Sequence, residues 1–166
     1  SVLAEWPVWQ TGGEMISTVS FTDATWNTLP FRLEAGTPNV GDAIAFGEAI
    51  RWFSSFDLAS LQKHEKALID YATKRAKEFE GLTIIGDASN KVGVLSFVLD
   101  AGHPADVGFL LDKQGIAIRT GDHCAQPLMN RFSVPGTARA SFAIYNTLDE
   151  IDVFFDALCK VKAMLA

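Results

Sequence analysis

The densest group of reactive side chains lies in the segment Arg119-Thr-Gly-Asp-His-Cys124. A predicted strand ends at Arg119, and the chain then turns through Gly121 and presents a thiol on a loop. A cysteine reacts as its thiolate, which nearby cations stabilise, and Arg119 and His123 are close to Cys124 in sequence. An arginine also offers a planar fork suited to a carboxylate. The spacing alone leaves open a reactive thiol beside a carboxylate-binding arginine, or an inert thiol beside an ion-pairing arginine.

Two further positions could bind anions. Arg139 opens an otherwise apolar stretch, where it either reaches solvent at a strand end or binds an anion. Gly36 and Thr37 form a turn just before a helix start. The glycine permits close approach of the backbone and the threonine adds a hydroxyl donor, so a phosphate could sit there, although a simple turn has the same pattern.

Cys159 serves as a comparison for Cys124. It follows Phe155 by four residues on the last predicted helix, where we expect it to pack as a small core hydrophobe. The sequence has no Cys-x-x-Cys pair and no second histidine at ligand spacing, so no metal site is expected. Two cysteines do not make a disulfide framework, and the composition fits a reducing cytoplasm.

The composition excludes several classes of protein. The chain has 166 residues, 48% of them hydrophobic and 20% charged, with a formal net charge of −6. A disordered chain would be less hydrophobic and more highly charged. No basic stripe is present to neutralise phosphates, so nucleic-acid binding is not expected. No apolar run approaches the ~18 residues of a membrane span. These properties favour a globular protein.

Regular elements begin after an aromatic, loop-rich first segment. Helix starts are predicted at Asn39 or Asp42, at Asp57, at Pro104 with His103 as a cap, and at Thr147, which opens a capping box with Glu150. Strands are predicted over residues 82–85, 92–99, 116–118 and 139–145. The order from residue 57 is α-β-β-α-β-loop-β-α, which predicts a small α/β sandwich.

Three segments together resemble a known enzyme family. They are residues 31–39 (FRLEAGTPN), 115–129 (GIAIRTGDHCAQPLM) and 139–147 (RASFAIYNT). They are similar to the C-terminal half of group II cysteine desulfurases or selenocysteine lyases of the SufS/CsdA type, in the class V aminotransferase superfamily. The resemblance implies an α/β fold: the small C-terminal domain of a fold-type I PLP-dependent transferase, with a small, mostly antiparallel sheet and helices packed on it. Residues 56–166 would form that domain, and residues 1–55 would be a remnant of the large PLP-binding domain.

The resemblance also implies roles for the reactive side chains. Cys124 would be the nucleophile that attacks the sulfur of L-cysteine held by PLP, so that a persulfide forms on the enzyme and L-alanine is released. Arg139 would bind the substrate carboxylate, with Arg119 in support. His123 could handle protons beside the thiol.

The cofactor and partners follow from the same resemblance. Gly36 and Thr37 would reach the PLP phosphate of the partner subunit in a homodimer. The persulfide would pass to a SufE/CsdE-like sulfur acceptor protein, for iron–sulfur cluster or other sulfur-compound biosynthesis in the cytoplasm, with L-cysteine or selenocysteine as substrate. The Schiff-base lysine of the family belongs to a Ser-x-His-Lys segment that this sequence lacks. We therefore expect these residues to be part of a longer enzyme and inactive alone.

Two other functions are compatible with the sequence. A free-standing thiol hydrolase could use Cys124 with His123, although adjacent residues on an extended loop point in different directions and a triad usually gathers its base from elsewhere. A non-catalytic module could bind a sulfur-acceptor protein. Preferential alkylation of Cys124 over Cys159 would favour a reactive thiol, whereas capture of an acceptor that survives loss of Cys124 would favour the module.

Overall fold

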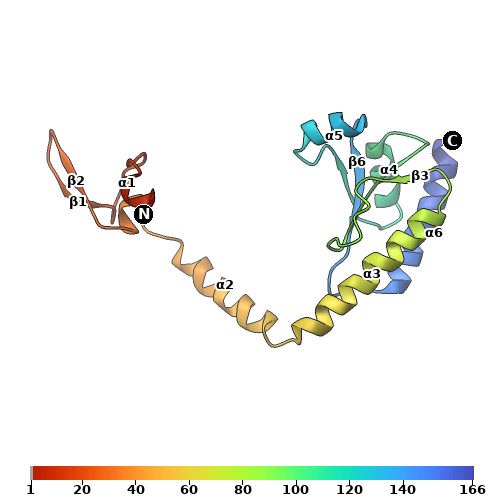
Figure 1. The fold of residues 1–166 in the computed structure, drawn as a ribbon, viewed down its shortest axis with the longest axis horizontal. Coiled ribbons are helices and arrows are strands. Elements are labelled where there is room, and N and C mark those ends of the chain that lie inside the picture. Colours follow the sequence, from red (N-terminus) through yellow and green to blue (C-terminus); the bar gives the residue numbers. More distant parts are fainter. Residues whose placement is uncertain (1) are drawn as a thin grey trace. The chain divides into compact units, whose positions relative to one another are not determined.

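The chain forms two compact units, one ending at Phe56 and the other beginning at Asp57. Both are seen in a computed structural model that describes residues 2–166 (Figure 1). Within this range, no helix has the length and apolar character needed to cross a bilayer.

The first unit is built from short elements and one longer helix. These are α1 (Val2–Glu5), the antiparallel strands β1 (Ile16–Val19) and β2 (Ala24–Trp26), the 3-10 helix η1 (Phe31–Leu33) and α2 (Val40–Phe53). Met15 is fully buried, whereas α2 contains no buried residue. Large apolar side chains remain exposed along the unit, including Trp9 at 85% and Phe46 at 67%. An apolar surface of this kind usually contacts further protein.

The second unit contains a four-stranded antiparallel sheet. Its elements are α3 (Leu58–Glu78), β3 (Leu82–Ile84), β4 (Val94–Leu99), α4 (Pro104–Asp112), β5 (Arg119–Gly121), α5 (Gln126–Phe132), β6 (Thr137–Ser141) and α6 (Leu148–Leu165). The strand order is β3-β4-β6-β5. The expected fold, an α/β unit with an antiparallel sheet and helices packed on it, is confirmed.

One face of this sheet forms the core. Leu95 and Phe97 of β4 pair with Ala140 and Ala138 of β6, and all four side chains are buried in one cluster with α3, α4 and α6. Helices α3 and α6 run side by side along this unit (Figure 1). Since side chains alternate along a strand, the residues between them, such as Arg139, project from the opposite face. That outer face carries the candidate site.

The predicted helix caps are confirmed. The side chains of Asn39 and Asp57 accept hydrogen bonds from the first turns of α2 and α3, and that of His103 accepts one from α4. Thr147 and Glu150 form the expected capping box at the start of α6. These contacts satisfy amides that lack partners within the helix. The caps of α4 and α6 fix the starts of the two helices that precede β5 and follow β6 in the sequence.

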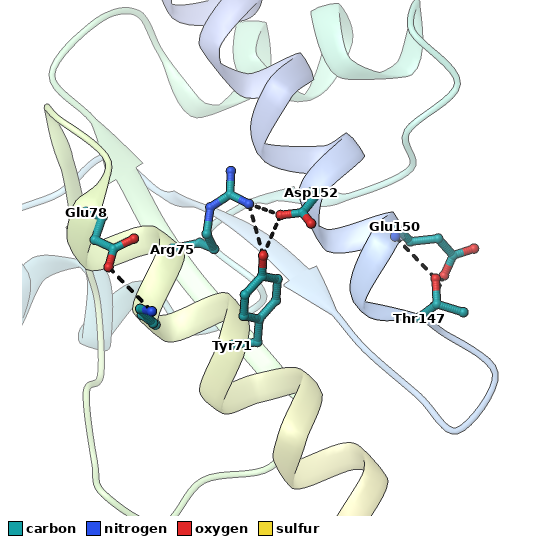
Figure 2. A network of polar contacts seen from close by, with 7 residues as sticks. Tyr71, Arg75, Glu78, Thr147, Glu150 and Asp152 are labelled. Carbon is teal, nitrogen blue, oxygen red and sulfur yellow. Dashed lines mark hydrogen bonds and ion pairs between the residues drawn. The ribbon is translucent and has the colours of Figure 1, made fainter.

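A polar network joins the two long helices of the second unit. Figure 2 shows Tyr71 and Arg75 of α3 meeting Asp152 of α6. The Tyr71 hydroxyl donates to Asp152 Oδ1 at 2.7 Å, and Arg75 pairs with the same carboxylate while its guanidinium lies 5.2 Å from the ring centre of Phe155. The network holds α3 against α6 beneath the sheet.

The predicted strands 82–85 and 92–99 are confirmed as β3 and β4, one and two residues shorter than predicted, whereas the other two strands differ more. Residues 116–118 are not a strand, because pairing with β6 begins only at Arg119 and the two isoleucines pack against the core instead. Strand β6 starts at Thr137 and ends at Ser141, because the chain then turns, with the Asn146 side chain accepting the Ala143 amide at 2.9 Å. The predicted loop before β6 contains the short helix α5.

The prediction that Cys159 packs in the core is wrong. Cys159 is exposed, whereas Phe155 and Leu158 are buried on α6. Four residues advance an α-helix by slightly more than one turn, which moves Cys159 past the edge of the apolar face.

Candidate active site

Two arginines lie directly opposite each other on the outer face of the sheet. Arg119 of β5 pairs with Arg139 of β6, and Arg139 pairs in turn with Ser96 of β4. Within residues 2–166, neither arginine has a carboxylate within ion-pair distance, and Arg139 Nε is buried without a hydrogen-bond partner. Like charges at paired positions repel each other. A carboxylate placed here would satisfy both guanidinium groups.

A tight turn after β5 presents the thiol. Gly121 has φ +117°, a conformation that side chains rarely allow, and the Asp122 carboxylate accepts the Cys124 amide at 3.0 Å. His123 and Cys124 both have left-handed backbones, with φ 54° and 58°. Because few non-glycine residues adopt this conformation, the turn must be held by its surroundings. The thiol of Cys124 is free and exposed.

A close backbone approach fixes the start of β6 against this turn. A Cβ atom on Gly136 would lie 2.9 Å from the carbonyl carbon and oxygen of Gly121. Only glycine allows this contact, which brings Thr137 into register with Gly121. Thr137 therefore lies beside the Cys124 turn, on the same face of the sheet as Arg139.

The ring of His123 lies against Thr137. His123 Nε2 is 2.9 Å from Thr137 Oγ1 and 3.2 Å from the Thr137 carbonyl oxygen, and Thr137 is 1% exposed. His123 Nδ1 is buried without a partner among the described residues. Thr137 is not among the residues predicted from the sequence. Strand alternation from Arg139 was the available signal, but it required β6 to begin two residues earlier than predicted.

Burial lowers the pKa of His123 below its usual value of 6.5, and the positive charge of Arg139 lowers it further. The charge of Arg119 also lowers this pKa, whereas the hydrogen bond with the Thr137 backbone and the charge of Asp122 raise it. The imidazole is therefore neutral at neutral pH, and it is able to accept a proton.

We expect the NMR titration midpoint of the His123 ring to fall below 6.5. Because the folded-state pKa is depressed, the unfolded chain binds more protons in this range. The stabilisation contributed by neutral His123 is therefore present above about pH 6.5 and is lost as the pH falls. Titration of the His123 ring resonances checks the midpoint, and urea unfolding at several pH values checks the sign. A midpoint above 6.5 would contradict a His123 ring that is partly buried and lies near two arginines.

Gly36 and Thr37 lie together in the first unit, in a geometry that fits a phosphate contact. Gly36 has φ +87°, donates its amide to Gly13 O at 2.9 Å, and has no atom within 4 Å of the position of a Cβ. The Thr37 side chain is exposed and makes no hydrogen bond within residues 2–166. Since the Gly36 amide is already engaged, the Thr37 hydroxyl and amide are the free donors. Arg119, His123, Cys124 and Arg139 are brought together separately, in the second unit.

The sequence and fold both match a known family. The family model described as aminotransferase class-V matches residues 1–154. The chain belongs to the class-V aminotransferase family. It is 44% identical over 160 residues to a probable cysteine desulfurase of Mycobacterium leprae and 43% identical over 166 residues to a cysteine desulfurase of Escherichia coli strain SE11. These alignments cover 96% and 99% of this class-V chain, but only 26% and 41% of the relatives.

Two solved structures of cysteine desulfurases agree with this assignment. The cysteine desulfurase CsdA from Escherichia coli superposes with a TM-score of 0.85 at 35% identity, covering 95% of this chain and 39% of CsdA. A cysteine desulfurase from Thermococcus onnurineus gives a TM-score of 0.86 at 33% identity, covering 98% of this chain and 40% of that one. The chain thus spans between 26% and 41% of the length of these relatives. The PLP fold-type I assignment is confirmed.

Proposed function

We propose that the chain is the sulfur-accepting part of a PLP-dependent cysteine desulfurase. The observation that carries the proposal is an exposed Cys124 thiol, held on a strained turn at the end of the strand whose Arg119 lies opposite Arg139. Relatives named cysteine desulfurase over this same region support it. In this proposal the units correspond to part of the large PLP-binding domain, residues 1–55, and to the small domain, residues 56–166.

The paired arginines bind the carboxylate of the substrate. L-Cysteine carries a carboxylate that matches the planar fork of a guanidinium. Arg139 is half-buried with an unsatisfied Nε, so it supplies the directional contact, and the more exposed Arg119 adds positive charge beside it. Binding there removes the repulsion between the two side chains and orients the thiol end of the substrate.

Cys124 accepts the sulfur atom. The Cys124 thiolate attacks the substrate sulfur, an Sγ–S bond forms, and the Cβ–S bond of the substrate breaks. With one proton returned to Cβ, the products are L-alanine and a Cys124 persulfide. The exposed position of Cys124 then lets a SufE/CsdE-like acceptor protein reach the persulfide for iron–sulfur cluster or other sulfur-compound biosynthesis. Selenocysteine fits the same contacts.

Gly36 and Thr37 would hold the PLP phosphate, in the partner subunit of a homodimer. The open backbone at Gly36 and the free Thr37 hydroxyl fit such a group. When bound, PLP supplies the electron sink that allows the carbon–sulfur bond of the substrate to break. Two free thiols are the expected state in a reducing compartment, which supports a cytoplasmic location.

The alternatives receive less support from the site. A Cys–His hydrolase needs a third group to orient its histidine, usually a carboxylate or amide, yet within residues 2–166 the His123 ring hydrogen-bonds only to Thr137. A non-catalytic module that binds a sulfur acceptor would have no need of the buried, unsatisfied Arg139 Nε beside the thiol.

Two measurements test the proposed function. We expect the 166-residue chain, mixed with PLP and L-cysteine, to release no alanine above background, because it contains no Ser-x-His-Lys segment. We expect the PLP-loaded enzyme that contains these residues to release alanine, with one added sulfur on the Cys124 peptide by mass spectrometry. Alanine release by the chain alone at the rate of an intact desulfurase would contradict the first expectation. Sulfur found only on Cys159 would contradict the second.

A further inference from the structure

The thiol lies on a turn whose backbone conformation is unfavourable for a cysteine. The Asp122 carbonyl accepts the Ala125 amide at 2.9 Å, which closes a turn with His123 and Cys124 at its centre. Both central residues have positive φ, 54° and 58°, as in a type I′ turn. Glycine and asparagine adopt this conformation most readily, whereas a cysteine adopts it at a cost in free energy. Contacts within the turn must offset that cost.

One hydrogen bond acts on Cys124 directly. The Asp122 carboxylate accepts the Cys124 amide at 3.0 Å, and within residues 2–166 this is the one hydrogen bond that Cys124 makes. A carboxylate that accepts the amide two residues further on stabilises a turn, and the negative charge strengthens the bond. The end of the turn is held separately, because the Ala125 carbonyl accepts the amide of the buried Met129 at 3.2 Å. Asp122 is therefore the side chain that acts on the conformation of Cys124.

The backbone conformation of Cys124 decides where its thiol points. Rotation about the N–Cα bond carries Cβ and the sulfur with it. A change of φ from 58° to a negative value, which an unrestrained cysteine prefers, would turn the sulfur toward another side of the loop. The paired Arg119 and Arg139 lie on strands and keep their places through the register of the sheet. Relaxation of the turn would therefore change the direction of the thiol without moving the arginines.

We propose that Asp122 is a positioning residue, whose hydrogen bond to the Cys124 amide holds the thiol in the exposed, left-handed geometry from which it reacts. The part played in sulfur transfer rests on the proposed function of Cys124, whereas the hydrogen bond lies within the second unit. Asparagine has a side-chain oxygen at the same place but no charge, and alanine has neither. Asp122→Asn and Asp122→Ala therefore separate the hydrogen bond from the charge.

Hydrogen exchange of the Cys124 amide, followed by NMR on the 166-residue chain, is the first test. Cys124 is exposed and belongs to no helix or strand, so without this bond its amide would exchange nearly as fast as in an unfolded chain. We expect exchange in the wild type to be at least about tenfold slower than in Asp122→Ala, the effect of one hydrogen bond to a charged group. Asp122→Asn should stay close to the wild type. Equal exchange in the wild type and Asp122→Ala would overturn the proposal.

The fold should tolerate both variants. Asp122 is half-buried on the turn and lies outside the cluster of residues that forms the core. Asp156→Ala removes an exposed carboxylate on α6 and should leave the Cys124 amide as it is in the wild type. If Asp122→Ala does not fold, the wild-type amide decides, because exchange at the rate of an unfolded chain would overturn the proposal.

Steady-state kinetics of the PLP-loaded enzyme are the second test. Asp122→Ala should lower kcat for alanine release about tenfold, the equivalent of about 1.4 kcal/mol. The KM for L-cysteine should not change, because Arg139 and Arg119 stay paired. Asp122→Asn should restore kcat, and Asp156→Ala should not affect it. An unchanged kcat in Asp122→Ala would overturn the proposal, and so would an equal loss in Asp122→Asn, which would assign the effect to the charge.

The two tests separate this inference from the proposed function. The exchange measurement uses the chain without PLP or substrate. A protected Cys124 amide in an enzyme that released no alanine from L-cysteine would refute the desulfurase proposal and leave the hold of Asp122 on Cys124 intact. An unprotected amide in an active enzyme would refute only the positioning by Asp122.

Discussion

Replacing Cys124 with alanine is expected to reduce alanine release from L-cysteine by at least about 10²-fold in the PLP-loaded enzyme, and to abolish the enzyme persulfide. A nucleophile that forms a covalent intermediate has no substitute within its site, so its loss removes the chemical step rather than weakening binding. Because Cys124 is exposed and lies on a turn outside the core, the substitution should leave the fold unchanged. Initial rates of alanine release, together with mass spectrometry of the Cys124 peptide, make the measurement.

The chain provides its own matched control for that experiment. Cys159 is also a free, exposed thiol, but it lies on α6 with no arginine paired beside it. Cys159→Ala should retain full activity and the persulfide. If Cys159→Ala lost the persulfide while Cys124→Ala kept it, the assignment of the sulfur acceptor would be wrong.

The features of the site that depend on residue type and on closeness in the sequence were predictable. Arg119, His123 and Cys124 are close in sequence, and Arg139 opens a recognisable apolar stretch, so their chemistry could be stated in advance. The cross-strand pairing of Arg119 with Arg139 could not, because it depends on the register between β5 and β6. That register is set by the backbone contact of Gly136 with Gly121, a tertiary feature. Thr137 was missed for the same reason.

In the fold, too, the elements set by local signals were predictable and those set by tertiary contacts were not. Side-chain caps such as Asn39, Asp57 and Thr147 are local, and the helices they begin were predicted at the right residues. The short helix α5 has no capping side chain, and Pro127 in its first turn is a weaker start signal than a cap. The isoleucines of residues 116–118 are apolar because they pack on the core, not because they pair with a strand. Apolarity alone does not distinguish these two causes.

Replacing Arg139 with alanine is expected to lower kcat/KM for L-cysteine by about 150-fold, the equivalent of about 3 kcal/mol for removing one partner of a buried charge pair. Arg139 has the stronger effect of the two arginines because its Nε is buried and unsatisfied, so a bound carboxylate gains a contact that water does not replace. Arg139→Lys keeps the charge but loses the planar fork, and should recover only part of the loss. Steady-state kinetics of alanine release give kcat and KM separately.

Two other arginines test whether charge alone explains this effect. Arg119→Ala should cause a smaller loss, because Arg119 is exposed and its removal also relieves repulsion at the paired position. Arg131→Ala, on the exposed side of α5 and without an ion pair in the described residues, should leave kcat/KM unchanged. Equal losses from all three would indicate general electrostatic attraction of the substrate. A loss confined to Arg139 and Arg119 would indicate a directional contact with the substrate carboxylate. A general attraction, which salt screens for all exposed charges, would also weaken when the charge of Arg131 is removed.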